Sequence, residues 1–426
     1  MKSIIKTSIK IFFIGIALTG LKISIAAEIP WASTPEEVGM SAQRLEQINK
    51  VMQRHIEDGD IQGAVTAVAR RGKIVHFEAH GLMDTEGKRP MLEDSVFIMM
   101  SSSKPILGVA AMIMVEEGLI RPEDPVSMYL PEFSDMQVAV LKEPVDENIS
   151  PRAIDRDNIP EHRLVPAKRE ITIHDLLTHT SGLGTGGLGS LVAERAPFPL
   201  PSDRTLATEM SRYASTPLDF QPGERWSYSG LVGLDVVARI IEVVSGQPYD
   251  EFINQRIFQP LGMNDTWFNV PDEYRDRRVV IEDRDMSLFF DRTTNYFSAS
   301  AGLNSIAEDY LKFEQMLVNG GELFGNRILS PRTIEMMSSD QAGGLYQGLR
   351  GPQQLGMGFG YTVYSVEDKI ASGARRSNGA FGWGGAFGTR TWTDPKEELT
   401  GVLMLQQPHR RTQYDFEDAI HQAIID

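Results

Sequence analysis

Three serines stand directly before a lysine in the stretch Phe97–Gly108, which reads FIMMSSSKPILG. A serine hydroxyl is a weak nucleophile until a neighbouring group takes its proton. Residues three apart in a helix share a face, and only Ser101 stands three positions before Lys104. A helix start also favours a developing oxyanion and a lowered lysine pKa, because its N–H groups are free and its potential is positive. The spacing therefore predicts Ser101 as a nucleophile and Lys104 as the base that activates it.

The spacing is not decisive by itself, because Ser3 and Lys6 show it too and a serine at a helix start is also a common cap. Hydrolysis needs a second proton carrier for the leaving group. Tyrosine serves this purpose when nearby cations lower its pKa. In the stretch PGERWSYSG, Tyr228 follows a Pro-Gly turn and directly precedes an expected helix. Tyr228 is therefore the candidate for the second proton carrier.

A third group of candidates lies in the glycine-bearing stretch GWGGAFGT, residues 382–389. Gly384 and Gly385 let the backbone approach a substrate closely, since neither carries a side chain. The N–H of Ala386 is expected to act beside that of Ser101 as a second oxyanion donor. Trp383 precedes them and is expected to contact the substrate.

The elements that must hold these residues are strands near both ends of the chain and helices in the middle. Helices are expected over 40–61 with Ser41 as N-cap, 104–118, 173–179, 231–244, 307–319 and 416–425. Strands are expected on both sides of a turn at 70–73, and over 359–366, 379–395 and 399–407. The polar, proline-punctuated stretch 142–169 is expected to form an excursion loop.

This order predicts a fold of the α/β class, of α+β type. The hairpin-like spacing of the C-terminal strands favours an antiparallel sheet flanked by helices, with an inserted and mainly helical lobe. The α/β lobe is expected to comprise about 28–100 and 295–426, and the helical lobe about 101–294. A cleft between the two lobes is the natural place for a site.

The first 27 residues have the pattern of a secretory signal peptide: lysines at the start, an apolar run from Ile11 to Leu21, and small residues at the end. The apolar run of 11 residues is too short for an uncleaved membrane anchor, which is the alternative. The mature domain is then 28–426, exported to the periplasm or secreted, with no stable membrane association. The chain has no cysteine, which excludes disulfides, thiolate catalysis and cysteine zinc sites.

The net charge of the chain is −16, and it becomes −20 without residues 1–27, which carry four lysines and no acidic residue. An acidic protein is repelled by phosphate backbones, so nucleic-acid binding is not expected. No H-E-x-x-H motif occurs among the eight histidines. His76 and His80 are four apart on an expected strand, a separation of about 13 Å. Neither a metal site nor a cofactor is therefore expected.

Two further sequence features are not expected to carry chemistry. The glycine cluster at 182–189 lacks the lysine and the preceding strand of a phosphate loop, so a mobile loop near the cleft is expected. The pattern G-x-S-x-G is absent, which argues against the α/β-hydrolase route to an esterase.

Taken in order, the three groups of candidates resemble the S-x-x-K, Y-x-N and K-T-G motifs of the serine β-lactamase and penicillin-binding-protein superfamily. Longer segments resemble its class C β-lactamase-like branch, among them GAVTAVARRGKIVHFEAHG, ITIHDLLTHTSGL and MGFGYTV, and the resemblance covers 29–425. It implies that Ser101 is acylated, that Lys104 is its base partner and that Tyr228 shuttles protons and activates water. His179, in HTSGL, resembles a family signature with a structural role.

Two departures from the family pattern indicate a subfamily. Trp383 stands where lysine would bind a β-lactam carboxylate, and Gly230 stands where asparagine would bond a substrate amide. A W-G-G triplet with an incomplete Y-x-N resembles the family VIII carboxylesterases. The resemblance implies a serine carboxylesterase for small, short-chain esters, and some enzymes of this kind also turn over β-lactams. A β-lactamase or a penicillin-binding-protein-type amidase or peptidase is the alternative, and the sequence leaves the oligomeric state open.

Overall fold

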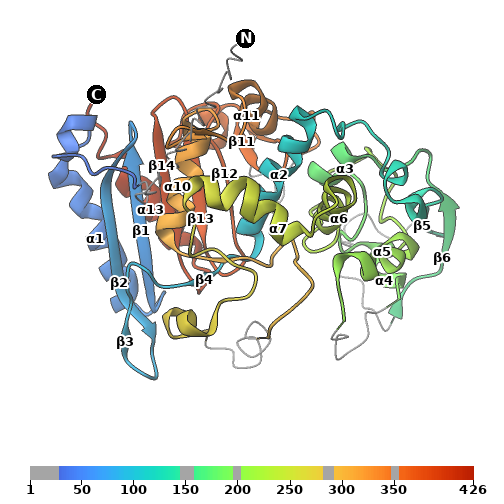
Figure 1. The fold of residues 1–426 in the computed structure, drawn as a ribbon, viewed down its shortest axis with the longest axis horizontal. Helices are drawn as coiled ribbons and strands as arrows, with labels where there is room; N and C mark the ends of the chain where they lie inside the picture. Colours follow the sequence, from blue (N-terminus) through green and yellow to red (C-terminus); the bar gives the residue numbers. More distant parts are fainter. Residues whose placement is uncertain (1–27, 144–157, 195–202, 282–291, 347–354) are drawn as a thin grey trace, which may run out of the picture.

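The computed structural model describes residues 28–143, 158–194, 203–281, 292–346 and 355–426 (Figure 1). The expected signal peptide, 1–27, lies outside these residues. No helix in the described ranges is both long and apolar enough to cross a membrane. The protein has the expected combination of a large antiparallel sheet with helices on both faces and a helical region to one side.

The sheet has eight strands in the order β10-β11-β12-β13-β14-β1-β2-β3, and every neighbouring pair is antiparallel. In chain order the strands are β1 (Gly63–Arg70), β2 (Lys73–Asp84), β3 (Arg89–Pro90), β10 (Met357–Phe359), β11 (Tyr364–Val366), β12 (Phe381–Gly384), β13 (Arg390–Asp394) and β14 (Leu399–Met404). The N-terminal strand β1 pairs directly with the C-terminal strand β14, with Val65 opposite Met404. Both ends of the chain therefore build one sheet, as the strand order in the sequence predicts.

Helices cover both faces of this sheet, and β1 is consequently buried along its whole length. On one face α1 (Ala42–Glu57) packs against α13 (Arg410–His421), and on the other α10 (Ala307–Val318) crosses β1, β13 and β14. Successive side chains of a strand point to opposite faces. Accordingly, Val68 packs in the core beneath α1 and α13, while its neighbour Ala67 packs in the main core on the other face.

The helical region lies to the right of the sheet in Figure 1. Its elements are α3 (Ile173–Leu177), α4 (Leu188–Val192), α5 (Leu206–Ser215), α6 (Gly233–Ser245) and, at its outer edge, the hairpin β5 (Gln137–Leu141) and β6 (His162–Pro166). Helix α2 (Lys104–Glu116) connects the two parts, since it contacts α6 on one side and β12 on the other. Its residues from 104 to 114 are all buried, which explains why the sequence of α2 is apolar on every face.

The remaining elements are short. They are β4 (Phe97–Ile98) paired with β7 (Asn304–Ser305), β8 (Glu322–Leu323) paired with β9 (Asn326–Arg327), α7 (Tyr249–Ile253), α8 (Gln259–Leu261), α11 (Pro331–Ser338), α12 (Lys369–Ser372), a π-helical turn (Asn254–Phe258) and several 3-10 turns. Single bridges join Trp267 to Asn304 and Val96 to Arg278. The chain between α7 and β7 thus returns to the sheet side before the predicted lobe boundary at 294.

Four local expectations differ from the structure. The strand expected over 379–395 is two antiparallel strands, β12 and β13, joined by a turn. The predicted excursion loop 142–169 contains a strand, β6, which pairs with β5, while 144–157 lies outside the described residues. The strand predicted over 359–366 is two strands, because the chain turns at Thr362, whose φ is +69°. Helix α13 begins at Arg410 rather than at 416. The start predicted from the sequence was too late, because the first turns are polar and carry no apolar periodicity.

Candidate active site

Ser101 lies in the 3-10 turn Met100–Ser103 that leads directly into α2. Met100, immediately before it, has a φ of +47°, a conformation that costs energy in a residue with a side chain. The three adjacent serines have different surroundings. Ser102 Oγ bonds Thr389 Oγ1 at 2.9 Å, and Ser103 Oγ accepts the N–H of Leu303 at 3.1 Å. Both are buried, so Ser101 is the one serine of the three that is open to a substrate.

Lys104 is fully buried at the first position of α2, with its Nζ 3.3 Å from Ser101 Oγ. The same Nζ donates to the backbone carbonyl oxygens of Gly230 at 2.8 Å and Ser300 at 2.7 Å. A buried amine of this kind needs such partners, since an unpaired charge or donor in the interior is costly. The two carbonyls therefore fix the direction from which Lys104 meets Ser101.

Tyr228 donates its hydroxyl to Ser101 Oγ at 2.7 Å, from the loop that precedes α6. The Lys104 Nζ also lies 5.0 Å from the centre of the Tyr228 ring. Ser101, Lys104 and Tyr228 thus meet at one point, as the sequence motifs predict. The 3.3 and 2.7 Å contacts are within reach for proton transfer between these groups.

His179 contacts the residues on both sides of Tyr228 in the chain. Its carbonyl oxygen accepts the N–H of Ser227 at 3.0 Å, and its Nδ1 accepts the N–H of Ser229 at 3.4 Å. Its ring packs edge-on against Tyr228 at 4.8 Å. Burial, with a smaller contribution from Lys104, lowers the pKa of His179 well below its ordinary value. A neutral ring can accept the bond from Ser229, so His179 positions Tyr228 without touching Ser101.

The end of strand β12 closes the other side of the site. A side chain at Gly385 would place its Cβ 2.3 Å from the carbonyl oxygen of Met99 and 2.3 Å from Thr389 Oγ1. Glycine is therefore required there for the strand to lie against the backbone just before Ser101. Gly230 differs, because a Cβ on it would meet only the Tyr228 ring, at 3.8 Å.

An aromatic cluster forms one wall of the site. Trp383 is 4% exposed and packs against Tyr228 at 5.6 Å and Phe359 at 5.4 Å between ring centres. Trp226, Tyr346 and Tyr364 complete the cluster. Ser101, Tyr228 and the four residues 383–386 all line one cavity of about 780 Å³, a volume suited to a small molecule. The predicted site residues therefore lie around a single cavity, with Lys104 buried behind them.

The family model described as Beta-lactamase matches residues 48–424. The chain belongs to the beta-lactamase family. It is 30% identical over 389 residues to Esterase EstB of Burkholderia gladioli, covering 84% of this chain and 89% of EstB. The structure of EstCE1, described as a hydrolase with promiscuous acyltransferase activity, superposes with a TM-score of 0.69 at 25% identity and covers 89% of this chain and 99% of its own.

A structure described as a family VIII carboxylesterase shares the fold, with a TM-score of 0.67 at 19% identity, and covers 90% of this chain and 99% of its own. The protein is therefore a beta-lactamase-fold serine hydrolase with esterases among its relatives, and enzymes of this kind act on small molecules.

Several groups that support the site in this beta-lactamase-family chain carry no signal in the sequence. The carbonyl oxygens of Gly230 and Ser300 belong to the backbone, which every residue has. Ser300 is held in turn by buried Asp235, whose Oδ1 accepts the Ser300 N–H at 2.9 Å. Burial raises the pKa of Asp235. The one sequence signal for this support was an acidic residue, Asp235, within the otherwise apolar start of α6.

Two expectations about other residues are now settled by distance. His76 and His80 are not held apart by the strand, because both rings bend toward Thr66 Oγ1, at 2.7 and 2.8 Å, and their centres are 6.3 Å apart. The glycine cluster does lie near the cleft. Gly184 and Gly186 line a second cavity, of about 590 Å³, which Tyr228 lines as well.

Proposed function

We propose that the protein hydrolyses small carboxylic esters through an acyl-enzyme on Ser101. The observation that carries the proposal is the pair of contacts made by Ser101 Oγ, to Tyr228 OH at 2.7 Å and to Lys104 Nζ at 3.3 Å. A serine hydroxyl with two proton carriers at the floor of an open cavity is the arrangement that nucleophilic acyl transfer requires.

The reaction would proceed in two acyl-transfer steps. Ser101 Oγ forms a bond to the ester carbonyl carbon while its proton passes to the neighbouring base. The oxyanion is stabilised by the N–H groups of Ser101 and Ala386. Collapse of the tetrahedral intermediate breaks the bond to the alcohol, which leaves with a proton. Water then attacks the acyl-enzyme and releases the carboxylic acid, and the proton returns to Ser101.

Burial supports a division of labour between the two proton carriers. Lys104 is fully buried and reaches the reaction only through Ser101, so it serves as the base that activates the nucleophile. The carbonyls of Gly230 and Ser300 hold its Nζ at 2.8 and 2.7 Å and keep it within 3.3 Å of Ser101 Oγ. Tyr228 lines both cavities, so it delivers the proton to the leaving alcohol and activates the water.

The substrate class follows from the wall of the cavity. The cluster around Trp383 offers aromatic rings to an acyl chain, and Trp383 carries no charge with which to bind a substrate carboxylate. Relatives named as esterases support the same choice. We therefore propose short-chain esters, and we propose in addition that residues 1–27 direct export.

One observation favours β-lactam or amide turnover as a second candidate. Arg375, Arg376 and Arg390 line the same cavity, where a substrate carboxylate could meet a cation. Each is already paired: Arg375 with Asp418, and the other two with Glu417. A carboxylate would have to compete with these ion pairs, which makes esters the better supported class.

The proposal is tested by comparing kcat/KM for p-nitrophenyl butyrate with kcat/KM for nitrocefin, using protein that lacks residues 1–27. We expect the ester value to be higher by at least about 100-fold, since losing one charged contact to a substrate costs on the order of 3 kcal/mol. A ratio near one, or below it, would transfer the assignment to the β-lactamase alternative. No turnover of either substrate would remove both.

A further inference from the structure

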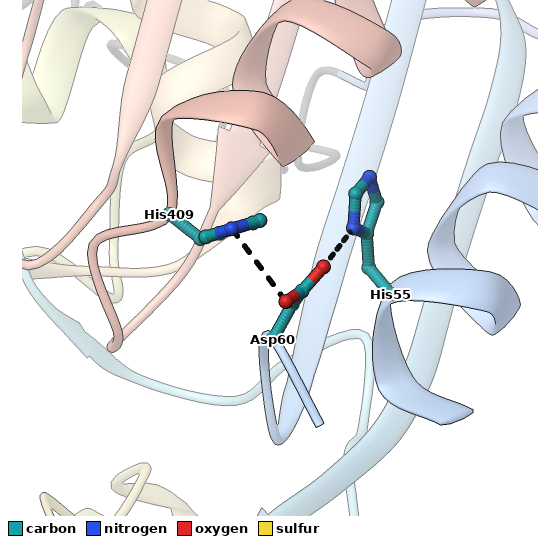
Figure 2. Close-up of side chains that lie close together, drawn as sticks. All are labelled: His55, Asp60 and His409. Carbon is teal, nitrogen blue, oxygen red and sulfur yellow. Dashed lines mark hydrogen bonds and ion pairs between the residues drawn. The ribbon is translucent and has the colours of Figure 1, made fainter. Parts of the chain in front are cut away.

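A second cluster of chemically active side chains lies outside the catalytic residues. His55 is in the last turn of α1, Asp60 is in the loop between α1 and β1, and His409 is the residue before α13 (Figure 2). One ligand atom from each lies within 4.8 Å of the other two. The two histidines are far apart in the sequence and therefore form no recognisable metal-binding motif. For this reason the sequence predicts no metal site, and the cluster arises only when the chain folds.

The carboxylate of Asp60 stands between the two rings. Its Oδ2 lies 2.6 Å from His55 Nδ1, and its Oδ1 lies 3.6 Å from His409 Nε2 (Figure 2). The backbone holds Asp60 in place, because its N–H donates to the carbonyl oxygen of His55 at 2.9 Å. Two imidazole nitrogens and one carboxylate form the donor set of many three-residue zinc sites, which leave a fourth position for water.

The outer nitrogens of both rings have partners of the kind that orient metal ligands. His55 Nε2 lies 3.0 Å from a carboxylate oxygen of Asp415, and His409 Nδ1 lies 2.8 Å from Thr412 Oγ1. A histidine that donates its outer N–H in this way presents the lone pair of its inner nitrogen to a metal. Asp415 and Thr412 therefore occupy the positions of supporting groups.

The cluster has room to close around an ion. Ligand atoms about 2.1 Å from a tetrahedral zinc are separated by roughly 3.4 Å. The present separations are all within 4.8 Å, so the widest must shrink by up to about 1.4 Å and the 2.6 Å contact of Asp60 with His55 must lengthen by about 0.8 Å. The side chains of Asp60 and His409 are 31% and 30% exposed and can make this movement, while His55 is buried and fixed. The nearby cations, Arg54 and Arg411, face Asp415 and are themselves well exposed.

We propose that His55, Asp60 and His409 form a binding site for a divalent transition-metal ion, with Zn²⁺ as the fitting probe. The ion would join the end of α1 to the start of α13, the two helices that cover one face of the sheet. The ligand atoms come from opposite ends of the chain, so binding would favour the folded state over the unfolded one.

The test is calorimetric titration of metal-free protein with ZnCl₂, using protein purified without a polyhistidine tag. We expect one saturable site per chain and a melting temperature that rises with zinc concentration. Cobalt bound at the same site should give the visible absorption of a four-coordinate ion. Asp60→Asn and His409→Gln should abolish saturable binding, and Asp415→Asn should weaken it by about 10-fold.

His162→Gln is the matched control, since it removes a histidine of the β5–β6 hairpin, outside the cluster. It should bind zinc as the wild type does. Circular dichroism establishes that each variant is folded, and an Asp60→Asn or His409→Gln protein that is folded but keeps full zinc binding would overturn the proposal. So would a wild-type protein with no saturable binding, which would leave the cluster as a set of ion pairs only.

Discussion

The two sides of the candidate active-site cavity are built on different physical principles. On the proton-transfer side, Ser101, Lys104 and Tyr228 are joined by hydrogen bonds of 3.3 Å or less. On the aromatic side, Trp383 is held by ring contacts of 5.4 to 5.9 Å, and its indole N–H has no hydrogen-bond partner among the described residues.

This difference indicates how readily each side can change. A hydrogen-bonded set fixes both the type and the direction of each group, because a lost partner leaves a buried donor or acceptor unpaired. Ring packing depends mainly on shape and tolerates other side chains of similar volume. This chain departs from the family pattern at Trp383 and Gly230. Both positions are expected to concern substrate recognition, and the candidate proton carriers Lys104 and Tyr228 keep the family's residue types. Reaction and specificity should therefore be separable by mutation.

The largest expected effect is the loss of the nucleophile. Ser101→Ala should lower ester kcat by at least about 10⁴-fold, because no other hydroxyl can form the acyl-enzyme. Ser102→Ala and Ser103→Ala should keep most of the activity, since these hydroxyls bond Thr389 and Leu303 away from the cavity. Steady-state turnover of p-nitrophenyl butyrate measures all three. An active Ser101→Ala protein would end the assignment of this side as catalytic.

Removal of the tyrosine hydroxyl should have the next largest effect. Tyr228→Phe keeps the ring contacts with His179 and Trp383 but removes the proton carrier, so kcat should fall by about 10²- to 10⁴-fold. An unchanged near-ultraviolet circular dichroism spectrum would show that the cluster is intact. If kcat is unchanged instead, Lys104 alone carries both protons and the proposed division between the two groups is wrong.

A charge placed on the aromatic side should alter specificity rather than catalysis. Trp383→Lys is expected to shift the ratio of nitrocefin to ester kcat/KM upward by about 10- to 100-fold, because an ammonium can bind the β-lactam carboxylate. Trp383→Phe, which keeps a ring and adds no charge, is the matched control and should leave the ratio nearly unchanged. Equal ratios for the two variants would contradict a role for this position in carboxylate recognition.

The smallest effect is expected from replacing a glycine on each side of the cavity, Gly385 or Gly230, and it concerns mainly the stability of the fold. Gly385→Ala forces a methyl group against Met99 and Thr389, which should cost about 1–3 kcal/mol and lower the melting temperature and activity together. Gly230→Ala places its methyl group in ordinary contact with Tyr228 and should leave the melting temperature nearly unchanged. Scanning calorimetry compares them, and similar melting temperatures would show that β12 can move away from Ser101.

The parts of the fold predicted well were those with strong local patterns. Ser41 caps α1 as expected, with its side chain accepting the Arg44 N–H, and the turn between β1 and β2 lies at residues 71–72. The start of α13 was missed because helix packing, not apolar periodicity, holds its polar first turns. The single strand predicted over 359–366 failed because the chain turns between Gly360 and Val363, and one isolated glycine inside a strand pattern is a weak signal for a turn.

The sequence by itself determined that Ser101 and Lys104 lie side by side, because they are three residues apart at the start of a helix. Only the tertiary structure decided which carbonyls hold Lys104, since Gly230 and Ser300 lie 126 and 196 residues further along the chain. The same is true of His55 and His409, which meet because α1 and α13 pack on one face of the sheet. Local geometry is encoded in spacing, whereas contacts between distant segments depend on how the layers pack.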